Sequence, residues 1–313
     1  MSGPALDRKA HSLPRALAPG ARVALVATAG PLDEARIERS IARCRTLGLE
    51  PVLLPAARQR HGYLAGRDEL RLADLQAAFD DPDVDAVWGL RGGYGSGRIL
   101  EALDLERQRR DPIPFIGFSD NTNLHVRHAA MGLVSFHGPH PGGDFPPETE
   151  RSLRRVLFDA EPAGRLPRRA GDPAPLTLVG GVVEAPLVGG NLSILASLCG
   201  TDDAPRLDGR ILFLEELNEP AYRVDRMLVQ LRRSGALHGV VGLALGRFLP
   251  AADDDHPLID CLAEFAERLG VPAVAELPVG HVEHNCTLPV GCRALLDGQG
   301  SELSITEAAV RTA

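Results

Sequence analysis

The first half of the chain alternates short apolar runs with amphipathic segments. Continuous apolar runs of four to seven residues between helical patterns are typical of a parallel sheet that is covered on both faces. We therefore predict an α/β fold whose N-terminal part is a Rossmann-like parallel-sheet domain. The predicted strands are 22–27, 51–54, 84–90, 113–116 and a segment that includes Val134 and Phe136, and the predicted helices are 33–47, 68–79, 97–105 and 120–131.

The pattern changes after residue 160, where prolines and glycines become frequent. Such punctuation is typical of a linker or flap. Apolar runs and helical patterns then return, so a second α/β domain is predicted. The expected organisation is a loose leader over 1–20, an N-terminal domain over 21–160, a linker or flap over 161–178 and a C-terminal domain over 179–313. In the last, the predicted strands are 211–214 and 240–245 and the predicted helices 224–233 and 258–269.

Composition narrows the class of protein. Apolar residues make up 44% and charged residues 24%, as in ordinary soluble domains. The net charge of −8, without a basic run, and the 4% of aromatic residues argue against nucleic-acid partners. No apolar stretch reaches the length of a membrane span or forms a signal-peptide core. Five cysteines without a C-x-x-C pair favour a reducing compartment, so we expect a cytoplasmic protein.

Candidate chemistry collects at the ends of the predicted strands. In parallel α/β sheets, ligands bind beyond the carboxyl ends of the strands. The loops there are rich in Gly, Ser, Asp or His, and they span 28–32, 91–97, 117–121 and 137–144.

The sharpest local pattern is at Ser119, which a predicted strand enters directly and a predicted helix follows. A serine on such a turn projects its hydroxyl above the sheet, and the backbone N–H of Asp120 then faces any oxyanion that forms. The alternative is that Ser119 or Asp120 only caps the helix. The full G-x-S-x-G pattern is missing because Asn121 replaces the second glycine.

A nucleophilic serine needs a base, and the base needs an orienting group. His281 lies in a Gly/Pro-bounded loop after a short predicted strand, and Glu215 directly follows the apolar run 211–214, with Glu216 beside it. Taken alone, each has a simpler interpretation: a solvated histidine, and a pair of surface carboxylates. Neighbouring residues of a strand point to opposite faces, so only one of the two glutamates can face a given histidine.

The glycine-rich loop over 90–97 follows the third predicted strand. Its glycines allow close approach of a ligand to backbone N–H groups. Phosphate binding is a rival interpretation, but neither nucleotide-binding glycine pattern is present. Arg91 is a candidate for binding a substrate carboxylate.

Metal binding is a further alternative, although neither candidate set has the H-E-x-x-H spacing on a helix. We therefore predict no metal and no cofactor. The two sets are His281, His284 and Cys286, and His137, His140 and Asp144.

Six short motifs follow one another along almost the whole globular chain in an order that resembles the LD-carboxypeptidase family of serine peptidases, which includes the microcin C immunity peptidases. The motifs are Arg91-Gly-Gly-Tyr-Gly95, Gly117-Phe-Ser-Asp120 with Asn121-Thr122, His137-Gly-Pro139, Gly189-Gly-Asn-Leu192, Leu214-Glu215-Glu216, and Pro278-Val-Gly-His281. The chain departs from the family pattern after His281, where Val282-Glu283 replaces the usual glycine.

The resemblance implies a role for each matched position. Ser119 would be the nucleophile, His281 the general base and then acid, and Glu215 the residue that orients the base. The backbone N–H groups of Asp120 and Gly93 would form the oxyanion hole. Gly92 in place of Gly93, and Glu216 in place of Glu215, remain open.

The resemblance also implies a substrate. The family cleaves an L–D peptide bond and releases the C-terminal D-Ala of muropeptide tetrapeptides during peptidoglycan recycling, and a homodimer is expected. The third peptide residue, lysine or diaminopimelate, stays undetermined. The alternatives are an immunity-type peptidase that cleaves microcin C-like aminoacyl-nucleotide toxins and, further away, a non-catalytic ligand-binding protein.

Overall fold

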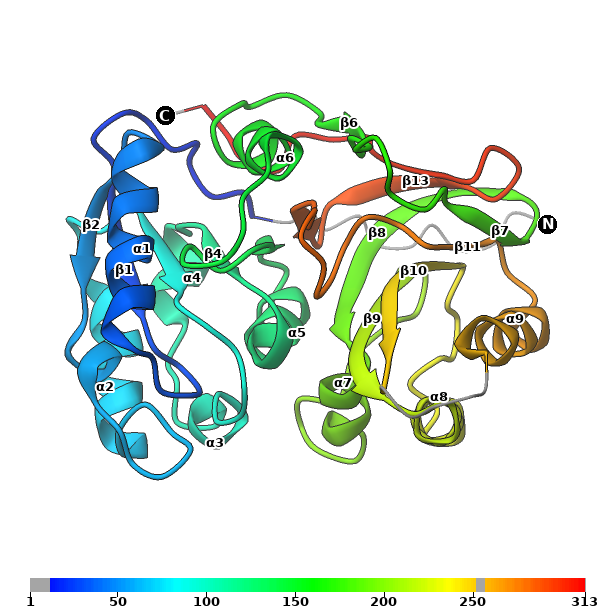
Figure 1. Cartoon of the computed structure of the whole chain (residues 1–313), viewed down its shortest axis with the longest axis horizontal. Helices are drawn as coiled ribbons and strands as arrows, with labels where there is room; N and C mark the ends of the chain where they lie inside the picture. The colour runs from blue at the N-terminus through cyan, green and yellow to red at the C-terminus, as the bar shows by residue number, and fades with distance from the viewer. Residues whose placement is uncertain (1–11, 252–256, 313) are drawn as a thin grey trace.

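The computed structural model describes residues 12–251 and 257–312 and contains two sheets with helices packed against them (Figure 1). The sheets lie side by side, and the chain completes most of the first before it builds the second. This arrangement confirms the predicted α/β fold with a parallel-sheet N-terminal part and a C-terminal α/β part. The first eleven residues of the predicted leader lie outside the described residues.

The first sheet has the strand order β12-β5-β4-β3-β1-β2, and its strands are parallel except for the edge strand β12. The order reverses between β1 and β3, and such a switch point opens a crevice for ligands at the carboxyl ends of the strands. The bounds are β1 Arg22–Val26, β2 Glu50–Leu53, β3 Ala86–Gly89, β4 Phe115–Gly117, β5 Ser135–His137 and β12 Leu288–Val290.

Helices follow the strands of this sheet at nearly the predicted places. The predicted helix over 97–105 is wrong, because α3 ends at Leu100 and a separate helix, α4, begins at Glu106. The Asp104 carboxylate accepts a hydrogen bond from the Glu106 N–H at 2.8 Å, in the turn between the two helices. The helices are α1 Glu34–Thr46, η1 Pro55–Arg58, α2 Asp68–Asp80, α3 Gly97–Leu100, α4 Glu106–Arg110, η2 Ser119–Asn121, α5 Thr122–Ala130 and α6 Pro147–Leu157.

The second sheet is eight-stranded, with the order β6-β14-β13-β8-β9-β10-β11-β7. Strands β8 to β11 are parallel, and antiparallel strands extend the sheet on both sides. The bounds are β6 Gly164–Arg165, β7 Leu176–Val179, β8 Val182–Asn191, β9 Ile211–Glu219, β10 Gly242–Pro250, β11 Ala273–Ala275, β13 Arg293–Asp297 and β14 Glu302–Ile305.

Three helices pack against the second sheet, and their apolar faces form one core with it. Leu228 of α8 and Leu262 of α9 are buried in this core beside Leu214 of β9. The helices are α7 Leu192–Leu198, α8 Ala221–Arg233 and α9 Leu258–Leu269.

The two parts of the chain are joined by one strand that pairs with the first sheet and by one helix that packs against the second. Strand β12 comes late in the sequence but pairs antiparallel with β5 of the first sheet. Val126 and Ala129 of α5 belong to the core of the second sheet. The helix that follows Ser119 is therefore held by both parts of the molecule.

Residues 12–20 are packed, unlike the loose leader that we predicted. Ser12 forms a bridge with Leu133, and the N–H of Leu17 donates to the Leu157 carbonyl at 2.8 Å. Leu17 itself is buried in the first core. Burial of Leu17 favours docking of this segment. The prediction of a loose leader relied on the prolines around Leu17 instead.

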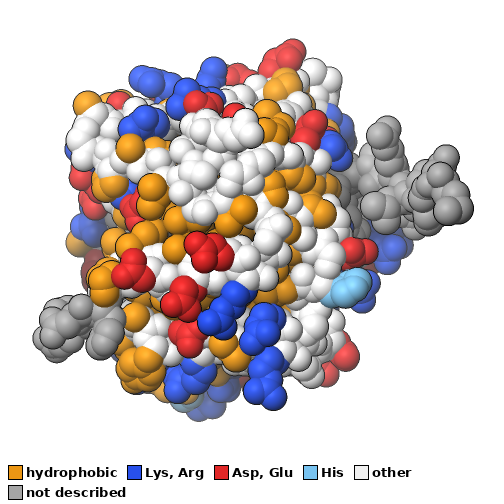
Figure 2. All heavy atoms as spheres, turned by 90° about the vertical axis from the view of Figure 1, so that its right-hand side faces the viewer, with side chains coloured by type: hydrophobic (Ala, Val, Ile, Leu, Met, Phe, Trp, Pro, Cys, Tyr) orange, Lys and Arg blue, Asp and Glu red, His pale blue; other side chains and the backbone are white. Residues whose placement is uncertain are grey.

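The face of the molecule at the right of Figure 1 carries acidic and basic side chains mixed among apolar ones (Figure 2). No single sign of charge dominates this face. Among the described helices, none is long and apolar enough to cross a membrane.

Candidate active site

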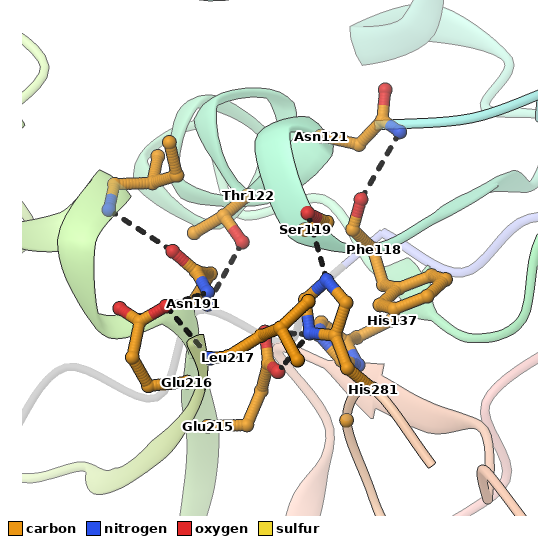
Figure 3. Close-up of polar contacts among 12 residues, drawn as sticks. Phe118, Ser119, Asn121, Thr122, His137, Asn191, Glu215, Glu216, Leu217 and His281 are labelled. Carbon is orange, nitrogen blue, oxygen red and sulfur yellow. Dashed lines mark hydrogen bonds and ion pairs between the residues drawn. The ribbon is translucent and has the colours of Figure 1, made fainter. Parts of the chain in front are cut away.

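Ser119 sits on the turn that joins β4 to α5. Its φ angle is +62°, a left-handed conformation that is uncommon for residues other than glycine. Non-glycine residues in such conformations cluster at functional sites, where the surrounding structure holds them in place. The turn points the Ser119 hydroxyl towards His281 (Figure 3).

Ser119, His281 and Glu215 form one hydrogen-bonded chain. The distance from Ser119 Oγ to His281 Nε2 is 3.0 Å, and that from His281 Nδ1 to Glu215 Oε2 is 2.7 Å. A carboxylate only accepts, so Nδ1 carries the proton of the neutral ring and Nε2 is free to accept from the serine hydroxyl. This is the arrangement that activates a serine nucleophile.

Two opposing influences act on the pKa of His281. Burial lowers the pKa of His281, but the hydrogen bond and charge of Glu215 outweigh burial and raise this pKa above its ordinary value. Glu215 is fully buried within β9, where it pairs with Asn191 of β8 and its two neighbours pair with β10. The acid therefore holds one ring tautomer in one orientation.

Glu216 points to the opposite side of β9 and has a different set of partners (Figure 3). Its Oε1 accepts from Asn191 Nδ2 at 2.9 Å and from the Leu217 N–H at 2.9 Å, and its Oε2 accepts from the Ser193 N–H at 2.7 Å. Burial raises the pKa of Glu216 although these donors oppose the shift. The surface-pair interpretation is wrong, because both glutamates are buried.

Asn191 connects this carboxylate to the helix of the nucleophile. The Asn191 N–H donates to Thr122 Oγ1 at 3.0 Å, at the end of β8. The close approach depends on Gly190, because a Cβ there would collide with the Thr122 side chain. The Gly-Gly-Asn motif thus brings β8 against the first turn of α5.

The side chain of Asn121 ties the loops of the first sheet together. Thr28 Oγ1 donates to Asn121 Oδ1 at 2.7 Å, and Asn121 Nδ2 donates to the carbonyls of Phe118 at 3.2 Å and Arg91 at 3.4 Å. Asn121 stands where the usual nucleophile turn has a glycine. Here it links the three loops that end β1, β3 and β4.

The glycine-rich loop lies directly against Ser119. A Cβ on Gly92 would lie 2.8 Å from both Cβ and Oγ of Ser119, so only glycine fits there. The Gly92 carbonyl accepts from the Gly30 N–H at 3.2 Å and from Arg91 Nε at 3.3 Å. In a planar trans peptide the next N–H points the other way, so the Gly93 N–H is directed away from Gly30.

The loop that carries His281 is held by the segment before β7. His284 Nδ1 lies 2.6 Å from Asp172 Oδ2, and its Nε2 lies 3.4 Å from Cys286 Sγ. Arg169 forms an ion pair with Glu283 at 2.8 Å. The segment over 161–178, predicted to be a linker or flap, thus contacts the loop that carries His281.

Two neighbouring histidines are neutral. Burial lowers the pKa of His140 to about 3 and that of His137 well below its ordinary value. His137 Nε2 is 3.9 Å from Glu215 Oε1, which for a neutral ring is a packing contact. The described residues contain no cluster of three or more His, Cys, Asp or Glu that could hold a metal ion.

An open pocket of about 380 Å³ lies over Ser119. It includes five of the six predicted site residues, while Glu215 lies behind His281. Four further lining residues were not among the predicted site residues: Arg36, Ser193, and Phe118 and Asn191, which stand only within two of the motifs. The lining residues are Arg36, Arg91, Gly92, Gly93, Phe118, Ser119, Asp120, His140, Asn191, Ser193, Ile194, Glu216, Leu217 and His281.

Comparison with known families decides the class of this site. Residues 23–138 match the model of the LD-carboxypeptidase N-terminal domain, and residues 184–296 match that of the C-terminal domain. The chain belongs to the LD-carboxypeptidase family. This confirms the resemblance of the six motifs, and it makes the chain a member of a family of serine peptidases.

Relatives of this LD-carboxypeptidase family member match most of its length. The murein tetrapeptide carboxypeptidase of Pseudomonas aeruginosa is 38% identical, with 88% of this chain and 93% of the relative covered. The crystal structure of muramoyltetrapeptide carboxypeptidase from Oxalobacter formigenes is 32% identical, with a TM-score of 0.79 and 92% and 99% of the two chains covered.

The microcin C7 self-immunity protein MccF is also similar in structure. Its TM-score is 0.85, with 96% of this chain and 100% of that chain covered. The sequence identity is 23%, so this likeness shows the shared fold.

Proposed function

We propose that the protein is a serine carboxypeptidase that cleaves an L–D peptide bond and releases the C-terminal D-Ala of muropeptide tetrapeptides. The observation that carries the proposal is the hydrogen-bonded chain from Ser119 through His281 to Glu215 at the floor of an open pocket. Nucleophilic catalysis by serine needs this order of groups.

In the first step, Ser119 Oγ attacks the carbonyl carbon of the scissile bond. His281 Nε2 takes the hydroxyl proton, and Glu215 stabilises the imidazolium that forms through its contact with Nδ1. The raised pKa of His281 suits this base, because a pKa nearer the working pH favours proton transfer.

The oxyanion would be bound by the backbone N–H groups of Asp120 and Gly93. Neither donates a hydrogen bond to another described residue. The fixed Gly92 carbonyl supports Gly93 over Gly92 as the second donor, since it turns the Gly93 N–H away from Gly30. Two such donors stabilise the tetrahedral intermediate.

Collapse of the intermediate breaks the carbon–nitrogen bond. His281 Nε2 gives its proton to the leaving amine of D-Ala, and the peptide remains as an ester on Ser119. His281 then takes a proton from water as the water attacks the ester, and the serine is regenerated. Each bond change uses a group already in the hydrogen-bonded chain.

The relatives support a muropeptide over an aminoacyl nucleotide as the substrate. The proteins named as murein or muramoyl tetrapeptide carboxypeptidases are 38% and 32% identical to this chain, whereas MccF is 23% identical. Among the pocket residues Phe118 is the one aromatic, and its ring already packs against His140 and His281. That leaves no open aromatic face for a nucleobase among these lining residues.

The proposal includes a cytoplasmic homodimer. The five cysteines of the chain are unpaired, as is usual in a reducing compartment, and this supports the cytoplasm. Light scattering of the purified protein would measure the oligomeric state.

Mass spectrometry tests the activity. Wild-type protein is incubated with L-Ala-γ-D-Glu-mDAP-D-Ala and, in parallel, with an aminoacyl-sulfamoyl adenosine, each with and without EDTA. We expect loss of one D-Ala from the tetrapeptide, unaffected by EDTA, and no cleavage of the nucleotide. Cleavage of the nucleotide alone would support the immunity-type function instead, and binding without turnover would support a non-catalytic protein.

A further inference from the structure

The pocket carries an uneven distribution of charge. Arg36 and Arg91 both line it, and neither forms an ion pair with any described residue. The two carboxylates in the lining already have donors of their own: Asp120 accepts from the Ser96 N–H, and Glu216 accepts from its three partners. Neither arginine is therefore paired with a carboxylate of the pocket lining.

Arg36 is held in the pocket by packing. It lies in the first turn of α1, where its backbone N–H donates to the Asp33 carboxylate at 2.7 Å. Its stem lies against Gly142, since a Cβ on Gly142 would be 2.8 Å from Arg36 Cγ. Its guanidinium donates no hydrogen bond to a described residue, and its Nε is buried without a partner. Such an unpartnered group is costly unless a ligand satisfies it.

The environment of Arg36 favours an anion. Burial lowers the pKa of Arg36 and the charges of Arg91 and Arg39 lower it further, while the carboxylates of Asp33 and Asp144 oppose the shift without reversing it. A carboxylate between the two guanidiniums would relieve both effects. The two terminal nitrogens of Arg36 donate to no described residue, whereas Arg91 donates Nη1 to the Pro31 carbonyl at 2.6 Å and Nε to the Gly92 carbonyl.

The position of the arginines relates them to the leaving group. The charges of Arg36, Arg91 and His281 help to lower the pKa of His140, so these groups lie near one another. The centroid of the Phe118 ring lies 4.4 Å from that of His140 and 4.8 Å from that of His281. The leaving amine must lie beside His281 Nε2 to receive its proton. In a C-terminal amino acid the carboxylate carbon is only two bonds from that amine.

We propose that Arg36, assisted by Arg91, binds the C-terminal carboxylate of the substrate and thereby restricts this enzyme to removing a terminal residue. The inference rests on the proposed function, because it needs a peptide substrate. Arg36 is then a specificity-determining residue: planar guanidinium groups bind carboxylates with two parallel hydrogen bonds. A peptide that continues beyond the leaving residue would offer no such anion.

The test varies the enzyme and the substrate together, as in a double-mutant cycle. The values of kcat/KM are measured for the tetrapeptide that ends in D-Ala and for the same peptide that ends in D-alaninamide, with wild type, Arg36→Met and Arg39→Met. Arg39 is a matched control, because it is an exposed arginine one turn along α1 that does not line the pocket.

We expect Arg36→Met to lower kcat/KM on the acid by about 100-fold, the size typical for loss of a buried charge pair, and to leave the amide within about twofold, since the amide has no charge to lose. Arg39→Met should change neither. Equal losses on both substrates, or none on the acid, would overturn the inference. Arg36→Lys, which retains a charge, should recover part of the preference for the acid if Arg36→Met folds poorly. Failure of the wild type on the acid peptide would instead refute the proposed function.

Discussion

The first sheet carries its chemistry on loops, whereas the second carries its acid inside a strand. Ser119, Gly93 and Arg91 lie beyond the carboxyl ends of β3 and β4, where substrate can reach them. Glu215 lies within β9 and is fully buried. The difference fits the proposed roles. Groups proposed to contact the substrate lie where it has access, and the group proposed to orient the base lies where it is rigid and shielded from water.

His281 joins these two kinds of position. Its loop leaves the second sheet at β11 and returns to the first as β12. Its Nε2 faces the loop serine, and its Nδ1 faces the strand acid. The relay is therefore completed only when the two sheets are correctly docked.

Among the variants that separate the strand from the loops, the largest effect is expected from the acid Glu215. Glu215→Gln should lower kcat by about 10³- to 10⁴-fold, because an amide no longer enforces the tautomer with the proton on Nδ1. Steady-state kinetics with the tetrapeptide would measure this. Glu216→Gln is the matched control and should lose less than about tenfold, since Glu216 does not contact His281. Equal losses in both variants would remove the distinction between the two glutamates.

Gly92→Ala is expected to follow. The added methyl would collide with Ser119 and displace the loop that presents the Gly93 N–H, so kcat should fall by about 10²- to 10³-fold, the usual result of losing one oxyanion donor. Gly180→Ala serves as the control, because a Cβ there meets no atom within 4 Å. An active Gly92→Ala enzyme would contradict the assignment of this loop.

The pH dependence should report the coupling of base and acid. His281 must be neutral to accept a proton, so kcat/KM should fall as the pH drops through the raised pKa of His281, above its ordinary value of 6.5. In Glu215→Gln, burial, which lowers the pKa of His281, is opposed only by the charge of Glu216, so the acid limb should move to lower pH than in the wild type in whatever activity survives. An unchanged limb would show that another group titrates.

The smallest effect concerns stability rather than rate. Glu216→Gln replaces an acceptor oxygen beside the Ser193 N–H with an amide that has fewer acceptor sites. The free energy of unfolding should fall by about 1–3 kcal/mol, the cost of a buried donor left unsatisfied. Urea denaturation of this variant and of the exposed control Glu101→Gln would measure it, and equal midpoints would contradict the structural role.

Local sequence patterns predict the positions of the loops at the edge of the first sheet. A strand that ends directly at Ser119 and a loop with four glycines already point to the carboxyl edge of a parallel sheet. These signals are short-range, so periodicity and turn chemistry carry them. The same rules mark the predicted helix over 258–269, which the structure reproduces as α9.

Local patterns do not predict which residue of the second sheet contacts His281. Alternation along β9 separates Glu215 from Glu216, but only the docked structure shows that His281 lies on the side of Glu215. Arg36 looked like an ordinary polar residue on an amphipathic helix. Its place in the first turn after β1, beside the switch point, was the available signal. The long strand β8 and the hairpin of β13 and β14 are set by pairing across distant segments.

The most direct test of the relay is a double-mutant comparison. The rates of D-Ala release are measured for Ser119→Ala, His281→Ala and the variant that carries both changes. Residues that act as one unit lose their effect together, so each single change should lower kcat by several orders of magnitude and the double variant should be no slower than either. Losses that multiply in the double variant, or a single variant with nearly wild-type turnover, would contradict a relay from Ser119 through His281.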